Sequence, residues 1–162
     1  SDGRISPEDM MRYINRKGRD NARTPMQWDA TANAGFTAGT PWFTVNPNYK
    51  EINVAEQEKD PDSILNFYKQ LIRLRKEYPI IVYGSYKLLY PEHKTAFVYE
   101  RVLENEKLLV ACNFSEEELE LEVPAEFVQN SAKLLISNYP EVGISEKMSL
   151  RPYEARVYRM TK

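Results

Sequence analysis

The spacing of apolar and polar residues divides the chain into three regions. Residues 63–77 repeat apolar residues at the three- and four-residue spacing of a helix, and the residues after Pro79 alternate with the period of two that is typical of strands. Residues 20–62 follow neither period over any length. The sequence therefore predicts an α+β chain, in which an irregular region and a helix precede a set of strands.

The helix predicted over residues 63–77 carries one apolar face. Asp62 or Ser63 can cap its beginning, and Pro79 stops it, because the residue before a proline avoids the helical conformation. The face consists of Ile64, Phe67, Tyr68, Leu71, Leu74 and Tyr78, widened by Leu65 and Ile72. Such a face predicts burial against other parts of a protein.

A shorter helix is predicted over residues 7–16. Ser6 can cap it, and Pro7 suits the first helical position, where no backbone N–H is needed. Gly18 is a natural terminator, since helices often end at a glycine.

The last part of the chain is predicted to form an antiparallel β-sandwich. Along residues 117–123, leucine and valine alternate with Glu118, Glu120 and Glu122, so we expect these glutamates on a solvent face and not in a metal or acid–base cluster. The apolar run 108–112 suits a strand covered on both faces, and residues 104–106 suit a tight hairpin turn. The strands are expected at residues 83–90, 96–103, 107–114, 117–123, 133–137 and 153–160.

The irregular region 20–62 is rich in aromatic residues. It contains Trp28, Phe36, Trp42, Phe43 and Tyr49, which a solvated linker would not need. A structureless stretch of this length is unusual in a compact domain. We therefore expect an ordered loop region that packs on a surface, much of which lies outside this chain.

Composition and charge exclude several classes of partner. The 162 residues are 42% hydrophobic and 28% charged, which is ordinary for a globular domain. The formal charge of −2 gives no electrostatic reason to expect nucleic acid or an anionic membrane. No apolar run approaches the roughly 20 residues of a membrane span.

Cysteine and histidine are too few for a metal site. Cys112 is the only cysteine and His93 the only histidine, so neither a zinc site nor an internal disulfide is expected. We interpret Cys112 as a buried small hydrophobe, in a chain that suits a reducing compartment, and His93 as an exposed turn residue. No phosphate-binding glycine loop is present, and no metal or cofactor is predicted.

One segment, residues 18–29, is dense in groups that form directional polar contacts. Arg19 and Arg23 flank Asp20 and Asn21, and arginine binds carboxylates or the hydroxyl pairs of a sugar through several N–H groups. From the chemistry of the residues alone, an arginine–aspartate network that fixes a turn is favoured, and a sugar-binding site is the less favoured interpretation.

The chain nevertheless resembles the oligo-1,6-glucosidase and α-glucosidase branch of the α-amylase superfamily, glycoside hydrolase family 13. The resemblance rests on an ordered series of segments that covers nearly the whole chain. They are RDNARTPMQWD at residues 19–29, NAGFT at 33–37, PWFTVNPNY at 41–49, EINV at 51–54, FYKQLIRLRK at 67–76 and LRPYEA at 150–155.

This resemblance implies a specific domain organisation. Enzymes of the family consist of a (β/α)₈ barrel followed by a small antiparallel β-domain. Residues 1–79 would then be the end of the barrel, with its last loop and last helix, and residues 80–162 the C-terminal β-domain. The aromatic loop would lie over the catalytic face of the barrel.

The resemblance also implies that the catalytic residues are not in this chain. The family hydrolyses α-glucosidic bonds with retention, which requires a nucleophile and an acid carboxyl about 5–5.5 Å apart. The segments that carry the family's catalytic carboxylates precede every part that matches here, and the chain has neither a Gly-Phe-Arg-x-Asp segment nor a His-Asp pair. We assign no catalytic residue and expect this chain alone to be inactive.

One substrate contact follows from the resemblance. The first arginine of the segment, Arg19 here, would hold the hydroxyls of the glucose in the innermost subsite. Arg23 is assigned to loop structure, and Trp28 and Trp42 to anchoring of the loop by burial in preference to sugar stacking.

The implied parent is a cytoplasmic α-glucosidase acting on short α-linked gluco-oligosaccharides. In that protein the β-domain would stabilise the barrel. A carbohydrate-binding or purely structural β-domain is the alternative.

Overall fold

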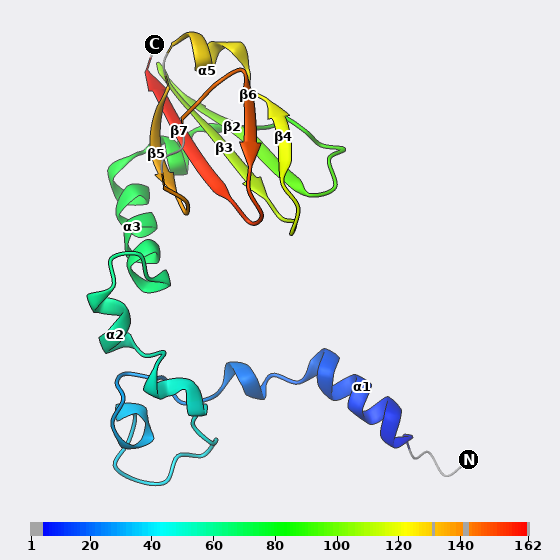
Figure 1. The fold of residues 1–162 in the computed structure, drawn as a ribbon, viewed down its shortest axis with the longest axis vertical. Coiled ribbons are helices and arrows are strands. Elements are labelled where there is room, and N and C mark those ends of the chain that lie inside the picture. Colours follow the sequence, from blue (N-terminus) through cyan, green and yellow to red (C-terminus); the bar gives the residue numbers. More distant parts are fainter. Residues whose placement is uncertain (1–4, 131, 141–142, 162) are drawn as a thin grey trace. The chain divides into compact units, whose positions relative to one another are not determined.

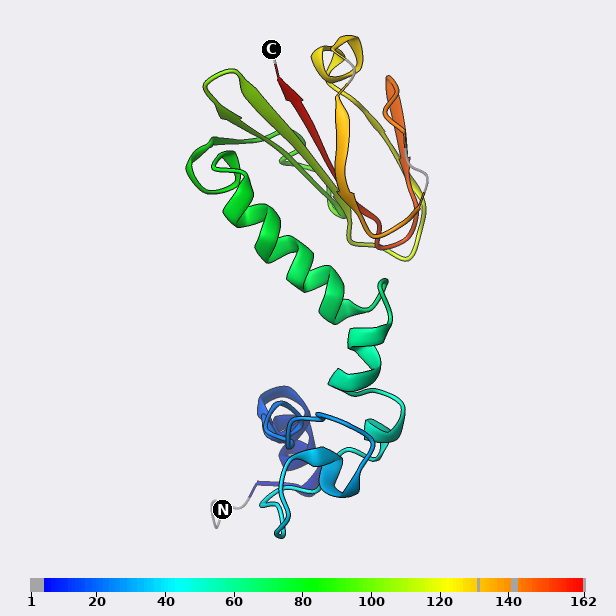
Figure 2. The same ribbon diagram turned by 90° about the vertical axis from the view of Figure 1, so that its left-hand side faces the viewer.

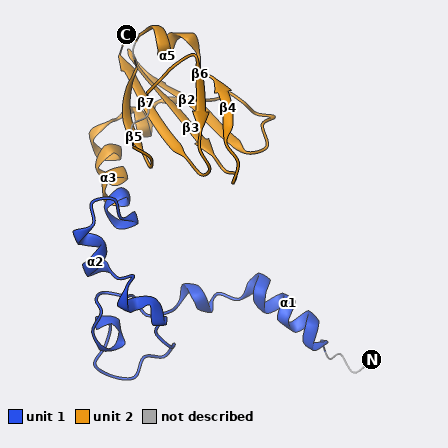
Figure 3. Ribbon diagram, viewed as in Figure 1, with its two compact units in different colours: residues 1–68 blue, residues 69–162 orange. Residues whose placement is uncertain are grey.

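The computed structural model describes residues 5–130, 132–140 and 143–161. The chain forms two compact units, residues 1–68 and residues 69–162 (Figure 3). None of the helices in the described ranges is long and apolar enough to cross a membrane.

The first unit contains short helical elements joined by irregular backbone. The helix predicted near the N-terminus is confirmed: Ser6 accepts a hydrogen bond from the backbone N–H of Asp9. Gly18 ends this helix in an extended conformation (φ −61°), and a Cβ there would lie 2.5 Å from the carbonyl oxygen of Ile14. The elements are α1 (Pro7–Lys17), three 3₁₀ turns, η1 (Asp20–Ala22), η2 (Ala32–Gly35) and η3 (Pro47–Lys50), and α2 (Val54–Lys59).

Helix α3 (Ile64–Glu77) begins in the first unit and continues in the second. Ser63 caps it as predicted, because its Oγ accepts a hydrogen bond from the N–H of Asn66 at 3.2 Å. The predicted apolar face is largely uncovered in this chain: Leu74 is the one buried residue of α3, and Ile64 is 82% exposed.

The second unit contains two antiparallel sheets. Five strands form one sheet in the order β1-β2-β3-β7-β5, and β4 pairs with β6 in the other (Figure 1). Helix α5 connects β4 to β5, and α4 precedes β1. The bounds are α4 (Ile80–Tyr83), β1 (Ser85–Leu88), β2 (Ala96–Leu103), β3 (Glu106–Asn113), β4 (Leu119–Glu122), α5 (Ala125–Gln129), β5 (Lys133–Ser137), β6 (Lys147–Leu150) and β7 (Ala155–Thr161).

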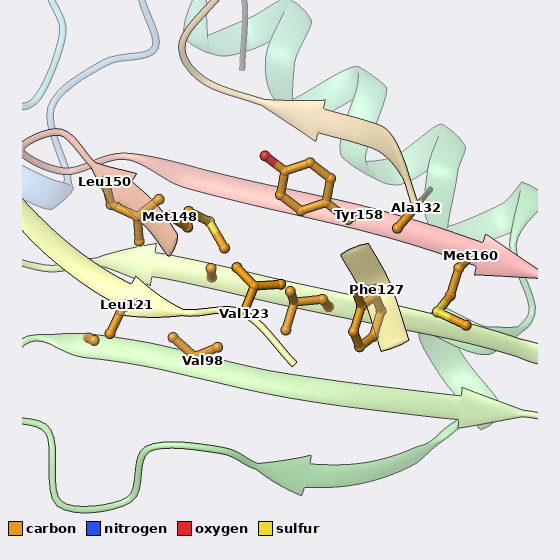
Figure 4. Packing of buried hydrophobic residues seen from close by; sticks show 12 residues of the cluster. Val98, Leu121, Val123, Phe127, Ala132, Met148, Leu150, Tyr158 and Met160 are labelled. Carbon is orange, nitrogen blue, oxygen red and sulfur yellow. The ribbon is translucent and has the colours of Figure 1, made fainter. Parts of the chain in front are cut away.

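An apolar layer fills the space between the two sheets (Figure 4). Phe127 of α5 closes one end of the layer and is fully buried. The ring of Tyr158 is part of the apolar layer, and its hydroxyl donates a hydrogen bond to the carbonyl oxygen of Gly143 at 2.6 Å. The other members are Ala96, Val98, Leu109, Ala111, Leu121, Val123, Ala132, Met148, Leu150 and Met160.

The opposite face of the five-stranded sheet carries helices of the same unit (Figure 2). Leu74 of α3 and Ile81 of α4 line a cavity of about 240 Å³ together with Leu108 and Val110 of β3. Since Leu109 and Ala111 face the apolar layer, β3 is covered on both faces, as the run 108–112 predicts.

Several strands lie where the sequence places them. β2 and β5 have the predicted bounds, and Glu104, with φ of +51°, forms the predicted tight turn between β2 and β3. The alternation along β4 is also confirmed, because Glu118, Glu120 and Glu122 are exposed. Helices α2, α4 and α5 and strand β6 were not predicted; with four to six residues each, they are too short to show a period.

A buried asparagine joins the ends of three strands. Asn113 is 3% exposed, and its Nδ2 donates to the carbonyl oxygens of Glu117 at 2.7 Å and Arg151 at 3.0 Å. Its Oδ1 accepts from the N–H and the hydroxyl of Ser115. The side-chain amide of Asn113 thereby provides hydrogen-bond partners for backbone groups after the end of β3, before the beginning of β4 and after the end of β6.

A fully buried carboxylate, Glu154, lies in the turn before β7. Its Oε1 accepts from Nε of Arg156 at 2.7 Å, and its Oε2 accepts from the backbone N–H of Arg151 at 2.8 Å. Burial alone would raise the pKa of Glu154, but the hydrogen bonds from the two arginines outweigh it and lower the pKa below its usual value. The carboxylate is therefore ionised and structural.

Replacing Asn113 with alanine should destabilise the second unit by about 2–3 kcal/mol, because several buried groups lose their partners at once. Urea unfolding followed by circular dichroism would measure this change. The matched control is Gln129→Ala, since Gln129 is exposed and its side chain forms no hydrogen bond with the described residues. Equal stability of the two variants would contradict the role of Asn113.

Replacing Glu154 with glutamine should destabilise the unit by about 3–5 kcal/mol at pH 7, because Arg156 stays buried without its counter-charge. The folded pKa of Glu154 lies below the unfolded value of about 4.3. Its stabilising contribution is therefore present above that value and is lost as the pH falls through the folded pKa.

The difference in unfolding free energy between the wild type and Glu154→Gln should consequently shrink as the pH is lowered below about 4.3. Urea titrations at a series of pH values would test this. Glu117→Gln, at an exposed carboxylate, is the control and should show little difference at any pH. If the difference in unfolding free energy between the wild type and Glu154→Gln stayed constant with pH, the charge of Glu154 would not contribute to stability.

Candidate functional site

The segment that carries Arg19 forms one short turn. Arg19 precedes η1, and its carbonyl oxygen accepts the N–H of Ala22 at 3.1 Å. The side chains of Arg19 and Arg23 are exposed, and neither forms an ion pair or hydrogen bond with the residues that the structure describes. The expected arginine–aspartate network is therefore not seen among the described residues, and the assignment of Arg23 to loop structure stays a prediction. The turn is held by backbone hydrogen bonds, which leave both guanidinium groups free.

The next turn is fixed by Asp29. Its carboxylate accepts the backbone N–H of Thr31 at 2.8 Å and also the hydroxyl of Thr31. The hydrogen bond from the Thr31 hydroxyl has the larger effect and, together with the bond from the backbone N–H, lowers the pKa of Asp29. The slight desolvation of the carboxyl has the opposite effect on the pKa. Asp29 is ionised, and its charge is used within its own turn.

Three consecutive residues in the left-handed region follow, at Asn33, Ala34 and Gly35, with φ of 53°, 58° and 66°. Such a conformation is costly for a residue with a side chain and persists only where its surroundings hold it. Here the carbonyl oxygen of the fully buried Ala34 accepts the N–H groups of Trp28 and Asp29. The loop is thus locked in one unusual shape.

Gly35 is the residue that this shape requires. A Cβ at Gly35 would lie 2.8 Å from both carboxylate oxygens of Asp29, and its positive φ disfavours any side chain. Asn33 completes the loop, since its Nδ2 donates to the carbonyl oxygens of Thr37 and Gly39. The sequence signal for this feature is the run of small residues with Asn33 and Gly35 that follows Asp29. The sequence pattern alone assigns no structural role to Asp29 or Asn33.

Backbone groups and two side-chain amides connect the loop to α2 and α3. The N–H groups of Val54 and Ala55 donate to the carbonyl oxygens of Gln27 and Trp28, both at 3.0 Å. Asn53, which is buried, caps α2 through its Oδ1. A single glutamine in α2, Gln57, then accepts the N–H of Leu65 at the start of α3. The loop region is ordered by hydrogen bonds, as expected from its sequence.

A pocket of about 440 Å³ lies beside this segment, entirely within the first unit. Its polar groups are Thr24, the amides Gln27, Asn53 and Gln57, and the hydroxyl of Tyr68. The remaining lining residues are Pro25, Met26, Ile52, Val54, Ile64 and Leu65. No carboxylate and no histidine lines the pocket, and Arg19 does not either. This set of residues can contact a ligand but contains no carboxyl pair of the kind that glycoside hydrolysis requires.

The tryptophans do not anchor the loop as predicted. Trp42 is 92% exposed, its ring centroid lies 6.1 Å from that of Phe43, and Trp28 is half exposed. Anchoring by burial is therefore wrong for Trp42 in this chain. The physical reason is that Pro25 and Ala34 are the only apolar residues of the first unit that are buried in the described part of the chain, so no apolar core is available to cover the indole rings.

The buried carboxylates of the second unit are already paired. Glu154 is bound by Arg156 and Arg151, and the largely buried Glu100 pairs with Lys87 at 3.4 Å. Among the described residues, no group of three or more His, Cys, Asp or Glu side chains could hold a metal ion. His93 is exposed, and its Nδ1 accepts the N–H of Ala96 at 2.9 Å, so it has a local role in its turn.

Cys112 is half-buried and not fully buried as predicted. Burial raises the pKa of its thiol, which keeps the sulfur protonated and poorly nucleophilic at neutral pH. The interpretation as a structural residue agrees with this environment.

Two sequence families match adjacent parts of the chain. The family described as alpha amylase, catalytic domain, matches residues 2–84, and the family described as maltogenic amylase, C-terminal domain, matches residues 86–157. The boundary between these matches and the boundary between the compact units lie on either side of residue 79. The predicted domain boundary between residues 79 and 80 stays a prediction.

Relatives of known function match nearly the whole chain. It is 51% identical to an oligo-1,6-glucosidase of Parageobacillus thermoglucosidasius over 156 residues, which are 95% of this chain and 28% of that protein. It is 54% identical to an oligo-1,6-glucosidase of Halalkalibacterium halodurans, with the same coverage. The chain thus spans less than a third of the length of these relatives.

Solved structures give the same picture. The trehalose-6-phosphate hydrolase of Bacillus licheniformis matches with a TM-score of 0.88 and 43% identity, over 97% of this chain and 29% of that one. The isomaltulose synthase of a Klebsiella species matches with a TM-score of 0.86 and 39% identity, over 98% and 28%. Since the catalytic-domain family covers just over half of the sequence and the C-terminal family follows it directly, the chain belongs to the α-amylase family of glycoside hydrolases.

Proposed function

We propose that this chain is the C-terminal portion of an α-glucosidase of the oligo-1,6-glucosidase type, which hydrolyses α-glucosidic bonds of short gluco-oligosaccharides with retention. The observation that carries the proposal is the identity of about half of all residues to oligo-1,6-glucosidases along 95% of the chain. A stand-alone carbohydrate-binding domain fits less well, because the matched relatives are named as enzymes.

In this proposal, residues 1–79 complete a (β/α)₈ barrel and residues 80–162 form the β-domain that stabilises it. Support comes from apolar surface that the chain cannot cover by itself. Helix α1 has no buried residue, and its Met11, Tyr13 and Ile14 are all more than half exposed. Contiguous apolar surface of this kind belongs against another part of a protein.

The proposal places the nucleophile and the acid in the part of the parent enzyme outside this chain. Retention requires two carboxyls about 5–5.5 Å apart, one of them free to attack. The buried carboxylates here, Glu154 and Glu100, are neutralised by arginine or lysine, and Asp29 is held by Thr31. None is available as a nucleophile.

Arg19 is proposed as the substrate-binding residue of this chain. Its guanidinium is exposed and forms no ion pair or hydrogen bond with the described residues, and its turn is defined by backbone hydrogen bonds. A free guanidinium on an ordered turn can donate to sugar hydroxyls without first breaking an ion pair. The partner is an α-linked gluco-oligosaccharide, and neither nucleic acid nor a membrane is invoked.

We place the parent in the cytoplasm. The basis is cysteine usage: Cys112 has no cysteine partner in this sequence, and a lone thiol of raised pKa is compatible with a reducing compartment.

The purified chain should release no glucose from isomaltose or from a chromogenic α-glucoside, because the proposal places the nucleophile and the acid that retention requires outside this chain. The measurement is a glucose-release assay beside a mock purification from the same host. Turnover that follows the chain through a second purification step would refute the assignment of every carboxylate here as structural.

In the full-length parent, Arg19→Ala should lower kcat/KM by about 10- to 100-fold, since a hydrogen bond from a charged donor is worth roughly 1.5–3 kcal/mol. Arg23→Ala is the matched control, because it removes another exposed guanidinium from the same turn. Its effect should stay below about threefold, within the small range of surface substitutions. Equal losses in both variants would sink the assignment of Arg19.

A further inference from the structure

A pocket of about 380 Å³ lies at one end of the five-stranded sheet, within the second unit. It is formed where α3 ends, where α5 ends, where β5 begins and where β7 ends; Figure 1 shows the last three at the same end of the sheet. Its lining residues are Tyr78, Asn130, Lys133, Leu134, Leu135, Arg159, Met160 and Thr161. The lining thus contains two cations and no carboxylate.

The two cations lie directly opposite each other. Lys133 of β5 pairs with Arg159 of β7 in the antiparallel register, so both side chains leave the sheet on the same face. Like charges directly opposite each other on neighbouring strands repel and destabilise the sheet. An anion bound between them would turn this repulsion into attraction.

Arg159 is only partly neutralised. One of its terminal nitrogens, Nη2, pairs with Glu106 of β3, and its guanidinium carbon lies 5.0 Å from the ring centroid of Tyr78. Its Nε is buried and has no hydrogen-bond acceptor among the described residues. A buried donor without an acceptor is rare in folded proteins, because its loss of hydration is not compensated.

Lys133 has no partner at all within the described ranges. Its ammonium is exposed and forms no ion pair or hydrogen bond there. The hydroxyls of Thr161 and Tyr78 line the same pocket and form no hydrogen bonds with described residues. Glu106, which pairs with Nη2 of Arg159, is not among the residues that line the pocket.

We propose that this pocket binds a phosphate group through Arg159, Lys133 and the hydroxyls of Thr161 and Tyr78. Arginine and lysine beside hydroxyl donors match the several acceptor oxygens and the double charge of phosphate. The volume exceeds that of a bare phosphate, so the group can be inorganic phosphate or the phosphate of a small monoester. A purely structural role of Arg159 with Glu106 would leave the directly opposed Lys133 without explanation. The site is independent of the proposed hydrolase function.

The test is an NMR titration of the full chain, labelled with ¹⁵N, with inorganic phosphate and separately with glucose 6-phosphate. Ionic strength is held constant with sodium chloride, because a general salt effect would otherwise mimic binding. We expect saturable shifts of amide signals from β5 and β7, with millimolar affinity. Tighter binding of glucose 6-phosphate would identify a monoester as the ligand, and equal affinity would identify the phosphate alone.

Lys133→Met should weaken binding of either probe about fivefold or more, since it removes one direct charge contact. Lys133 is exposed, so the variant should fold. Lys94→Met is the matched control, because Lys94 is also exposed, lies outside the pocket, and is unpaired in the described part of the chain. Shifts that do not saturate, or equal weakening by both substitutions, would overturn the proposal.

Discussion

The apolar layer between the five-stranded sheet and the β4–β6 pair is the contact on which the second unit depends. Two short strands cannot form a stable sheet in water by themselves. The β4–β6 pair persists because Leu121, Met148 and Leu150 are buried against β2, β3 and β7. Polar groups next to this layer, chiefly Asn113 and Glu154, then need internal partners, and they find them at the strand ends. Hydrophobic burial thus sets the positions at which the buried hydrogen bonds form.

The first unit is held together differently. Its described hydrophobic side chains are mostly exposed, and order comes from side chains bonded to the backbone. Asp29, Asn33 and Asn53 each close one turn, and Gln57 joins α2 to α3. Such bonds define a local shape well but contribute little net free energy each. This combination is what one expects of a segment whose apolar contacts lie with another part of a larger protein, as in the proposed barrel.

The sequence predicted the elements whose signal is repeated often enough to read. The structure confirms the predicted positions of β2 (eight residues), β5 (five), α1 (eleven) and α3 (fourteen). Each of these elements has a clear period or a cap in the sequence. Helix α5 and strand β6 have five and four residues, and only the core that they cover defines them. The exposure of Trp42 could not be predicted, because the burial of a side chain depends on a partner surface and not on the residue itself. The left-handed run at Asn33, Ala34 and Gly35 depends on contacts to Asp29 and Trp28, which periodicity does not report.

The irregularity in β5 has a consequence for how the protein behaves among its own copies. β5 is the last strand of its sheet, and its pairing with β7 shifts register between Leu134 and Ile136. An edge strand with regular geometry offers its free N–H and C=O groups to any other extended chain. A bulge bends that edge, and the charge of Lys133 at its beginning opposes the approach of another strand. The sheet can therefore end in water without recruiting a sixth strand from a neighbouring molecule, which protects the protein from aggregation.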